Sequence, residues 1–336
     1  MMKSLMLCGV VLSLLCGLCV PATAADTPKT LLILGDSIAT GHSLPDYRSD
    51  GNPKSQYSWA TLLAKHYEAK QINLAVDGDT TTDLLAVIER ADNRAAIASA
   101  DAICISIGGN NFLRLMAELF RENTLFSTDA VEAAVTPMLH AAEADLDRIF
   151  TALKEKNPTA PILVQTLFEP FRYVTVPVAE GVTVADWMRG YIERYNTLLK
   201  AKAAEHGVLC VDVYEAFCTK GQESWVYVSL TSGTLAEALN TLANANPHPA
   251  KDGHRGIYDA YVEMAGEQLA AALNAVEETV ESTDEDALTS ESEVTTSETT
   301  HEGGSAPAQA WLPWVAVPLA AVVAVGIGIL LKKKSI

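Results

Sequence analysis

The sequence predicts an α/β fold in which helices cover both faces of a five-stranded parallel sheet, a doubly wound sandwich. Two observations predict it. Short apolar runs bounded by turn residues recur along the chain, and longer stretches with helical periodicity separate them. Strands that alternate with helices form parallel sheets that are buried on both faces. No linker or repeat interrupts this alternation, so we expect a single domain.

The individual elements follow from the same pattern. Strands are predicted at residues 31–34, 72–76, 102–107, 162–167 and 208–213. Helices are predicted at residues 58–68, 81–89, 130–154, 187–206 and 256–275. Ligands of doubly wound folds bind beyond the carboxyl ends of the strands. The residues that follow each strand are therefore the first candidates for a site.

The N-terminal segment, residues 1–25, has the pattern of a secretory signal peptide. Lys3 precedes an apolar run over residues 5–20, and small residues follow at 21–25. This order of a basic start, a short apolar run and a small-residue cleavage site is typical of exported proteins. We expect the folded domain to begin near Asp26.

The C-terminal segment predicts a membrane anchor. Residues 311–331 carry no charge, and three lysines follow at once in the tail, residues 332–336. About 20 apolar residues span a bilayer as a helix, and lysines flanking it favour the cytoplasmic side. Together with the export signal, this predicts a single-pass cell-membrane protein whose domain lies outside the cytoplasm. The alternative is a hydrophobic helix that docks on the domain.

A stalk is predicted between domain and anchor, at residues 277–310. Its first 26 residues hold ten Asp or Glu and no Lys or Arg, a composition too polar to form a core. Of the total charge of −18, the remaining domain, residues 26–276, carries −12. Such an acidic domain argues against nucleic acid as a partner.

Three cysteines remain after the signal peptide. Cys104 and Cys210 lie in predicted strands and are interpreted as small core residues. A bridge between Cys210 and Cys218 stays open. No Cys or His cluster has the spacing of a metal site, and we expect no metal or cofactor.

The first candidate for chemistry is Ser37, just past the first strand in Gly35-Asp36-Ser37. A serine after a strand, beside a glycine that permits a tight turn, can present its hydroxyl at the rim of the sheet. The alternative is a serine that caps the following helix.

Two further loops offer hydrogen-bond donors at the same rim. Gly78 follows the second strand and could turn its backbone N–H toward the cleft, while Asn110 follows the third strand and carries a carboxamide. An oxyanion hole needs two or three such donors aimed at one point. An ordinary turn is the simpler reading of each loop alone.

A fourth segment, residues 246–256, offers two histidines before the last predicted helix. His248 lies directly before a proline, and His254 follows a glycine near the helix start. Either could act as a general base.

These four segments, in this order, resemble the four sequence blocks of the SGNH, or GDSL, hydrolases. The resemblance covers residues 31–275 and implies a flavodoxin-like sandwich of the SGNH-hydrolase type. It also implies Ser37 as nucleophile and His248 as base, because the family's histidine directly precedes a proline. The implied oxyanion hole consists of the backbone N–H groups of Ser37 and Gly78 and the side chain of Asn110.

Two positions depart from the family pattern. Asn111 stands where members often carry aspartate, which is a mild change. Asn246 and Ala245 stand where members carry the aspartate that orients the histidine. An asparagine can orient an imidazole, but it cannot neutralise an imidazolium. Asn246 is therefore a doubtful third member of a catalytic triad with Ser37 and His248. Asp252 is another candidate for the carboxylate that orients the histidine.

The function predicted from these residues is hydrolysis of carboxylic esters, either acetyl esters or lipid esters, by a Ser-His centre. The substrate could be a small molecule, a glycan or a lipid. The alternatives are a catalytically weakened module that binds a glycan or lipid, and a surface adhesin without a small-molecule site. Substrate choice is expected to lie in the loops at residues 168–184 and 218–245. Aromatic residues of the first loop could line a pocket, or they could pack the loop onto the sheet.

Overall fold

The computed structural model describes residues 28–122, 124, 127–179 and 181–273. Its central sheet has five strands in the order β2-β1-β3-β4-β8, and every pair is parallel. The strands are β1 (Thr30–Gly35), β2 (Lys70–Asn73), β3 (Ala102–Ser106), β4 (Ile162–Gln165) and β8 (Leu209–Val211). The predicted five-stranded parallel sheet is confirmed, in the strand order of flavodoxin-like folds.

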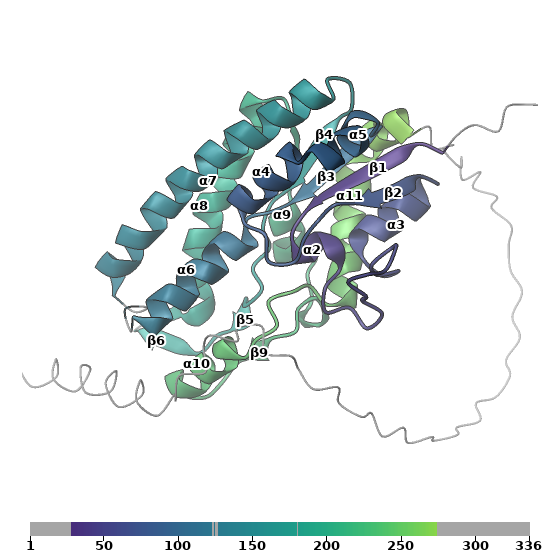
Figure 1. Ribbon diagram of the computed structural model, residues 1–336. Coiled ribbons are helices and arrows are strands. Elements are labelled where there is room, and N and C mark those ends of the chain that lie inside the picture. Colours follow the sequence, from purple (N-terminus) through teal and green to yellow (C-terminus); the bar gives the residue numbers. More distant parts are fainter. Residues whose placement is uncertain (1–27, 123, 125–126, 180, 274–336) are drawn as a thin grey trace, which may run out of the picture.

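Helices cover both faces of this sheet (Figure 1). One face carries α4 (Thr81–Glu89), α5 (Arg94–Ala98), α6 (Gly109–Arg121), α7 (Thr128–Lys156) and α8 (Val184–Glu205). The other carries α2 (Ser37–Thr40), α3 (Trp59–His66), α9 (Val213–Thr219) and α11 (Lys251–Leu273). Successive strand residues point to opposite faces, so Leu32 and Leu34 pack in the first core while Leu31 and Ile33 pack in the second.

Short elements extend the lower end of the molecule in Figure 1, where α10 and β9 lie. They are β5 (Tyr173–Val174), β6 (Pro177–Ala179), β7 (Val182–Thr183), β9 (Ser229–Leu230) and α10 (Leu235–Ala243). Two single turns, η1 (Ala91–Asn93) and η2 (Glu223–Trp225), complete the described elements. Most of this end comes from the two loops in which substrate choice was expected.

Several element boundaries differ from the sequence prediction, and two of them bear on the site. The second strand ends at Asn73, although backbone hydrogen bonds from Leu74 and Val76 to β1 continue the pairing. The last helix begins at Lys251, five residues before the predicted start, so His254 lies inside it. Helix α6 was not predicted as an element, although its apolar residues gather on one broad side of the helix.

The end of β1 approaches β3 closely, and a glycine makes this possible. Gly35 has φ of +131°, and a Cβ built on it would lie 1.9 Å from the carbonyl oxygen of Ser106. The next residue, Asp36, donates its N–H to that oxygen at 3.1 Å. The residues after β1 are thereby fixed beside those after β3, at the point where the strand order reverses and ligands bind.

The predicted signal peptide, the stalk, the membrane span at 311–331 and the basic tail all lie outside the described residues. Within the described ranges, no helix is both long enough and apolar enough to cross a bilayer. Cys104 is buried on β3 and Cys210 half-buried on β8, and both are free thiols, as is the exposed Cys218. The open question of a bridge between Cys210 and Cys218 is therefore answered: the structure does not pair them.

Candidate functional site

The structure brings Ser37 and His248 into contact. Ser37 is the first residue of α2, directly after β1, and its side chain is 5% exposed. His248 lies in the loop before α11 and is 3% exposed. The hydroxyl oxygen of Ser37 lies 2.8 Å from Nε2 of His248. A serine hydroxyl within hydrogen-bond reach of an imidazole is the arrangement of an activated nucleophile and its base.

The other ring nitrogen of His248 faces Asn246. Nδ1 lies 2.7 Å from Oδ1 of Asn246, which also accepts the backbone N–H of His248 at 3.1 Å. The hydroxyl of Ser43 donates to the same oxygen at 3.3 Å. Since Oδ1 can only accept, the proton of the neutral imidazole belongs on Nδ1, which leaves Nε2 free to accept from Ser37.

His248 is held in its neutral form. Burial above all, together with the nearby His42, lowers its pKa from 6.5 to about 3, while Asp77 opposes the shift. A base with such a low pKa is unprotonated over the whole physiological range. Asn246 does not raise the pKa of His248 back toward its usual value, because an amide carries no charge to stabilise the imidazolium.

A second histidine and a carboxylate lie beside this pair, and sequence reasoning missed them. The rings of His42 and His248 are 5.2 Å apart between centroids. Asp77 lies 2.8 Å from Nδ1 of His42 and accepts hydrogen bonds from Thr40 at 2.6 Å and Tyr47 at 2.5 Å. Burial raises the pKa of Asp77, but these hydrogen bonds outweigh it and hold the value at about 2. Asp77 therefore stays ionised.

The three predicted oxyanion donors are only partly assembled. Ser37 and Asn110 line the same pocket, whereas Gly78 is outside its lining. The Asn110 amide donates one hydrogen to the backbone oxygen of Asp79 at 2.9 Å, and its second hydrogen is the one that could meet an oxyanion. The N–H of Ser37 is at the first position of a helix, where backbone donors lack partners within the helix.

Asp36 directly precedes Ser37, and the sequence predicts no role for it. Its side chain caps α2 by accepting the N–H of Ile38 at 3.0 Å. Burial raises its pKa from 3.8 to about 7; the hydrogen bond from Ile38 opposes this, and Asp77 and Asp79 add to it. The buried carboxyl next to Ser37 therefore titrates near neutrality.

Three further candidates lie away from the reacting atoms. His254 is fully buried in α11, where its Nδ1 accepts the N–H of Trp59 at 3.4 Å and its Nε2 has no partner among the described residues. Asn111 ties α6 to α4 through two hydrogen bonds with Thr81. Asp252 is exposed in the first turn of α11. The idea that Asp252 supplies the orienting carboxylate is wrong, because Asn246 occupies that position at Nδ1.

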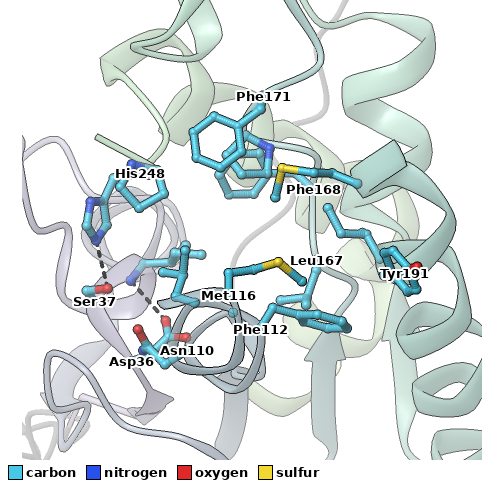
Figure 2. A pocket seen from close by; sticks show the side chains of 17 residues that line it. Asp36, Ser37, Asn110, Phe112, Met116, Leu167, Phe168, Phe171, Tyr191 and His248 are labelled. Atoms are coloured by element: carbon cyan, nitrogen blue, oxygen red, sulfur yellow. Dashed lines mark hydrogen bonds between the residues drawn. The ribbon is translucent and has the colours of Figure 1, made fainter. Parts of the chain in front are cut away.

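A largely apolar pocket opens beside Ser37. It encloses about 680 Å³, including space open to solvent. Figure 2 shows Ser37 and His248 on one side of this pocket, with Phe171, Met116 and Tyr191 on the others. Phe168, Pro170 and Phe171 belong to the lining, while Phe168 and Phe171 also pack in hydrophobic clusters, so both outcomes that the sequence left open for this loop occur.

The chemistry available here is nucleophilic attack on a carbonyl group. The site combines a hydroxyl nucleophile, a neutral base and amide donors beside an apolar cavity. No group of three or more His, Cys, Asp or Glu side chains that could hold a metal ion occurs in the described ranges.

Comparisons with known proteins identify the family. The model of the GDSL-like Lipase/Acylhydrolase family matches residues 33–256, which include Ser37, Asn110 and His248. The uncharacterized protein YpmR of Bacillus subtilis (strain 168) is 25% identical over 156 residues, 46% of this chain and 57% of that protein. The match thus spans less than two thirds of that relative's length.

Two solved structures share the fold. Phospholipase A1 from Streptomyces albidoflavus NA297 has a TM-score of 0.53 at 21% identity, over 71% of this chain and 100% of that one. The lipase Lip_vut3 from a goat rumen metagenome has a TM-score of 0.50 at 18% identity, over 72% and 99%. At identities this low, the structural likeness establishes a common fold and no more.

Proposed function

Because the chain belongs to the GDSL-like lipase/acylhydrolase family, we propose that it is a serine ester hydrolase with Ser37 as nucleophile and His248 as general base. The observation that carries this proposal is the 2.8 Å approach of the Ser37 hydroxyl to Nε2 of His248, at the wall of a largely apolar pocket. The burial that keeps His248 neutral supports the same role.

The reaction proceeds by acyl transfer. Ser37 Oγ attacks the ester carbonyl carbon while Nε2 of His248 accepts the hydroxyl proton. The carbonyl oxygen becomes an oxyanion stabilised by the N–H of Ser37 and the amide of Asn110, which line the same pocket. The carbonyl re-forms, the ester bond breaks, and His248 returns its proton to the alcohol. Water then attacks the acylated serine by the same path and releases the carboxylic acid.

Asn246 orients the base in this scheme. Its Oδ1 holds the proton on Nδ1 of His248, and the hydroxyl of Ser43 helps to fix that oxygen. The ionised Asp77 is the carboxylate whose charge favours the imidazolium, and it acts from beyond His42. The positive charge that forms on His248 is thus stabilised from a distance rather than by direct contact.

A fluorophosphonate probe tests the nucleophile. Treatment of the full-length chain should label Ser37, as located by mass spectrometry of the digested protein. Ser37→Ala should abolish both labelling and hydrolysis of p-nitrophenyl acetate, while the exposed Ser99→Ala should leave both unchanged. Absence of labelling at Ser37, under conditions that label a control serine esterase, would reject the mechanism.

The competing function is a hydrolase-like module that binds a glycan or lipid without turnover. The observation in its favour is Asn246, a neutral group where an orienting carboxylate would speed catalysis. Steady-state hydrolysis of p-nitrophenyl acetate that depends on Ser37 supports the enzyme. A ligand that binds the wild-type chain and is recovered unchanged supports the module.

We further propose that the domain lies outside the cytoplasm and is held to the membrane by a C-terminal anchor. The support is the signal-peptide pattern of residues 1–25 and the uncharged stretch at 311–331 followed by lysines. Membrane fractionation of cells that express the full-length chain should recover it in the membrane, and protease added to intact cells or spheroplasts should digest the domain. Deletion of residues 311–336 should release it.

A further inference from the structure

A second apolar chamber adjoins the pocket beside Ser37. It encloses about 650 Å³, again including space open to solvent. The two cavities share four lining residues: Leu113, Met116, Phe171 and Met188. The two cavities therefore lie side by side and share part of their walls, with the Ser-His pair on the wall of the inner chamber and α10 on the wall of the outer one.

One wall of this space is a stripe of α6. Its residues are spaced i, i+3, i+4 and i+7: Leu113, Met116, Ala117 and Phe120. All four are half-buried. Met116 also packs against the core of the domain, which Phe112 and Leu119 join from the adjacent side of the same helix. The other three stripe residues lie outside the core clusters and face the cavity, which is typical of a surface that binds apolar ligands.

The outer wall comes from α8 and α10. Trp187 and Met188 line it from α8, and Leu239, Leu242 and Ala243 line it from α10. No charged residue is among the described residues that line the outer chamber. Polar glycan hydroxyls would lose their water here without finding partners, whereas methylene groups gain by burial.

The arrangement of the two cavities favours one of the two ester classes left open by the sequence. An acetyl group would occupy the vicinity of Ser37 and leave the outer chamber empty. A chain of eight or more carbons would extend toward α10.

We propose that the two chambers form an acyl-chain channel and that the substrates are esters of medium- to long-chain carboxylic acids. The assignment rests on the proposed function, since it takes Ser37 as the atom from which the acyl chain extends. It identifies Ala117 and Ala243 as specificity-determining residues, because both line only the outer chamber.

Chain-length profiles test the channel. Burial of each methylene group favours binding about fourfold, so kcat/KM of the full-length wild-type chain should rise at least tenfold from p-nitrophenyl acetate to the octanoate. Ala117→Trp fills the outer chamber from α6 and should lower kcat/KM for the dodecanoate at least tenfold, with acetate changed less than twofold. Ala243→Trp, from α10, repeats the test should the first variant fold poorly. Asn240→Trp, exposed on α10, is the matched control and should resemble wild type.

Binding separates this inference from the proposed function. Calorimetric titration of the Ser37→Ala chain with dodecanoic acid should show binding that Ala243→Trp weakens at least tenfold, and butyric acid should bind far more weakly. Acetate hydrolysis that depends on Ser37, with a flat chain-length profile and no dodecanoic acid bound, would overturn the channel alone. Dodecanoic acid bound without hydrolysis of any ester would overturn the proposed function and leave the channel standing.

Discussion

Oδ1 of Asn246 lies 2.7 Å from Nδ1 of His248 and also accepts the backbone N–H of that histidine. The asparagine therefore occupies the place of the orienting acid and fixes both the ring and its tautomer. It supplies no negative charge, and the pKa of His248, lowered chiefly by burial, is about 3. Orientation and charge are separated in this site.

Asn246→Asp is expected to leave kcat/KM at pH 8 equal to wild type or up to about tenfold higher. A carboxylate at this position would stabilise the imidazolium and raise the pKa of His248. For wild type, kcat/KM should stay level down to about pH 4, since the base becomes protonated only near pH 3. In the variant the acidic limb should move to higher pH. A pH profile of p-nitrophenyl acetate hydrolysis measures both effects, and a large loss of activity in Asn246→Asp would show that this residue does not orient His248.

The neighbouring asparagines of the third loop should behave differently. Asn110→Ala removes a donor to the oxyanion and is expected to lower kcat by about 10²–10³. Asn111→Ala removes two hydrogen bonds to Thr81 and should cost about 1–3 kcal/mol in the free energy of unfolding, with kcat within a few-fold of wild type. Steady-state kinetics and urea unfolding of both variants check this contrast, which fails if Asn110→Ala loses less activity than Asn111→Ala.

Much of the fold could be predicted because the central strands are mostly apolar. Strands β1, β3 and β4 are buried almost completely, so each reads as an unbroken run. Ser37 and Asn110 were expected together, since the carboxyl ends of parallel strands lie at one edge of the sheet.

The rest of the site depends on how loops pack in three dimensions. The contact between Asp77 and His42 joins residues 35 positions apart, and neither residue has a sequence pattern of its own. Ser43 reaches Asn246 across 203 positions. The outer chamber requires α10 to face α6, and amphipathic patterns reveal that a face is apolar without naming what lies opposite.

Asp36→Asn should stabilise the chain at neutral and higher pH. The carboxyl of Asp36 titrates near 3.8 when unfolded and at about 7 when folded. Between these values the folded state keeps a proton that the unfolded state has lost. The free energy of unfolding of the wild type therefore falls as the pH rises from about 4 through 7. The amide keeps the acceptor that caps α2 and never ionises. The difference in unfolding free energy between the variant and wild type should therefore grow over that range and level off above pH 8 at about 2–4 kcal/mol. Asp92→Asn, at an exposed position, should show no such growth. If the difference from wild type in unfolding free energy depended on pH in the same way for both variants, the prediction would be contradicted.

Ser43→Gly is expected to raise stability and lower activity together. Ser43 has φ of +70°, a left-handed conformation that costs a residue with a side chain about 1–2 kcal/mol relative to glycine. Its carbonyl accepts the hydroxyl of Tyr227 at 2.9 Å, which holds the loop in place, and its own hydroxyl lies 3.3 Å from both Asn246 Oδ1 and His248 Nδ1. Glycine would relieve the backbone strain and should raise the unfolding free energy by about 1 kcal/mol.

The same change removes the hydroxyl that steadies Asn246, so kcat/KM should fall about three- to tenfold, the effect of one neutral hydrogen bond of roughly 1 kcal/mol. Ser43→Ala loses the hydroxyl but keeps the strain, and should lose activity without the gain in stability. Glu68→Gly is the matched control, because Glu68 is exposed and has φ of +47°; it should gain stability at unchanged activity. Full activity in Ser43→Gly would show that the strained serine contributes nothing to the orientation of His248. Backbone strain beside a catalytic base is retained only where the surrounding contacts enforce it. This set of variants measures what the strained serine costs in stability and what it contributes to activity.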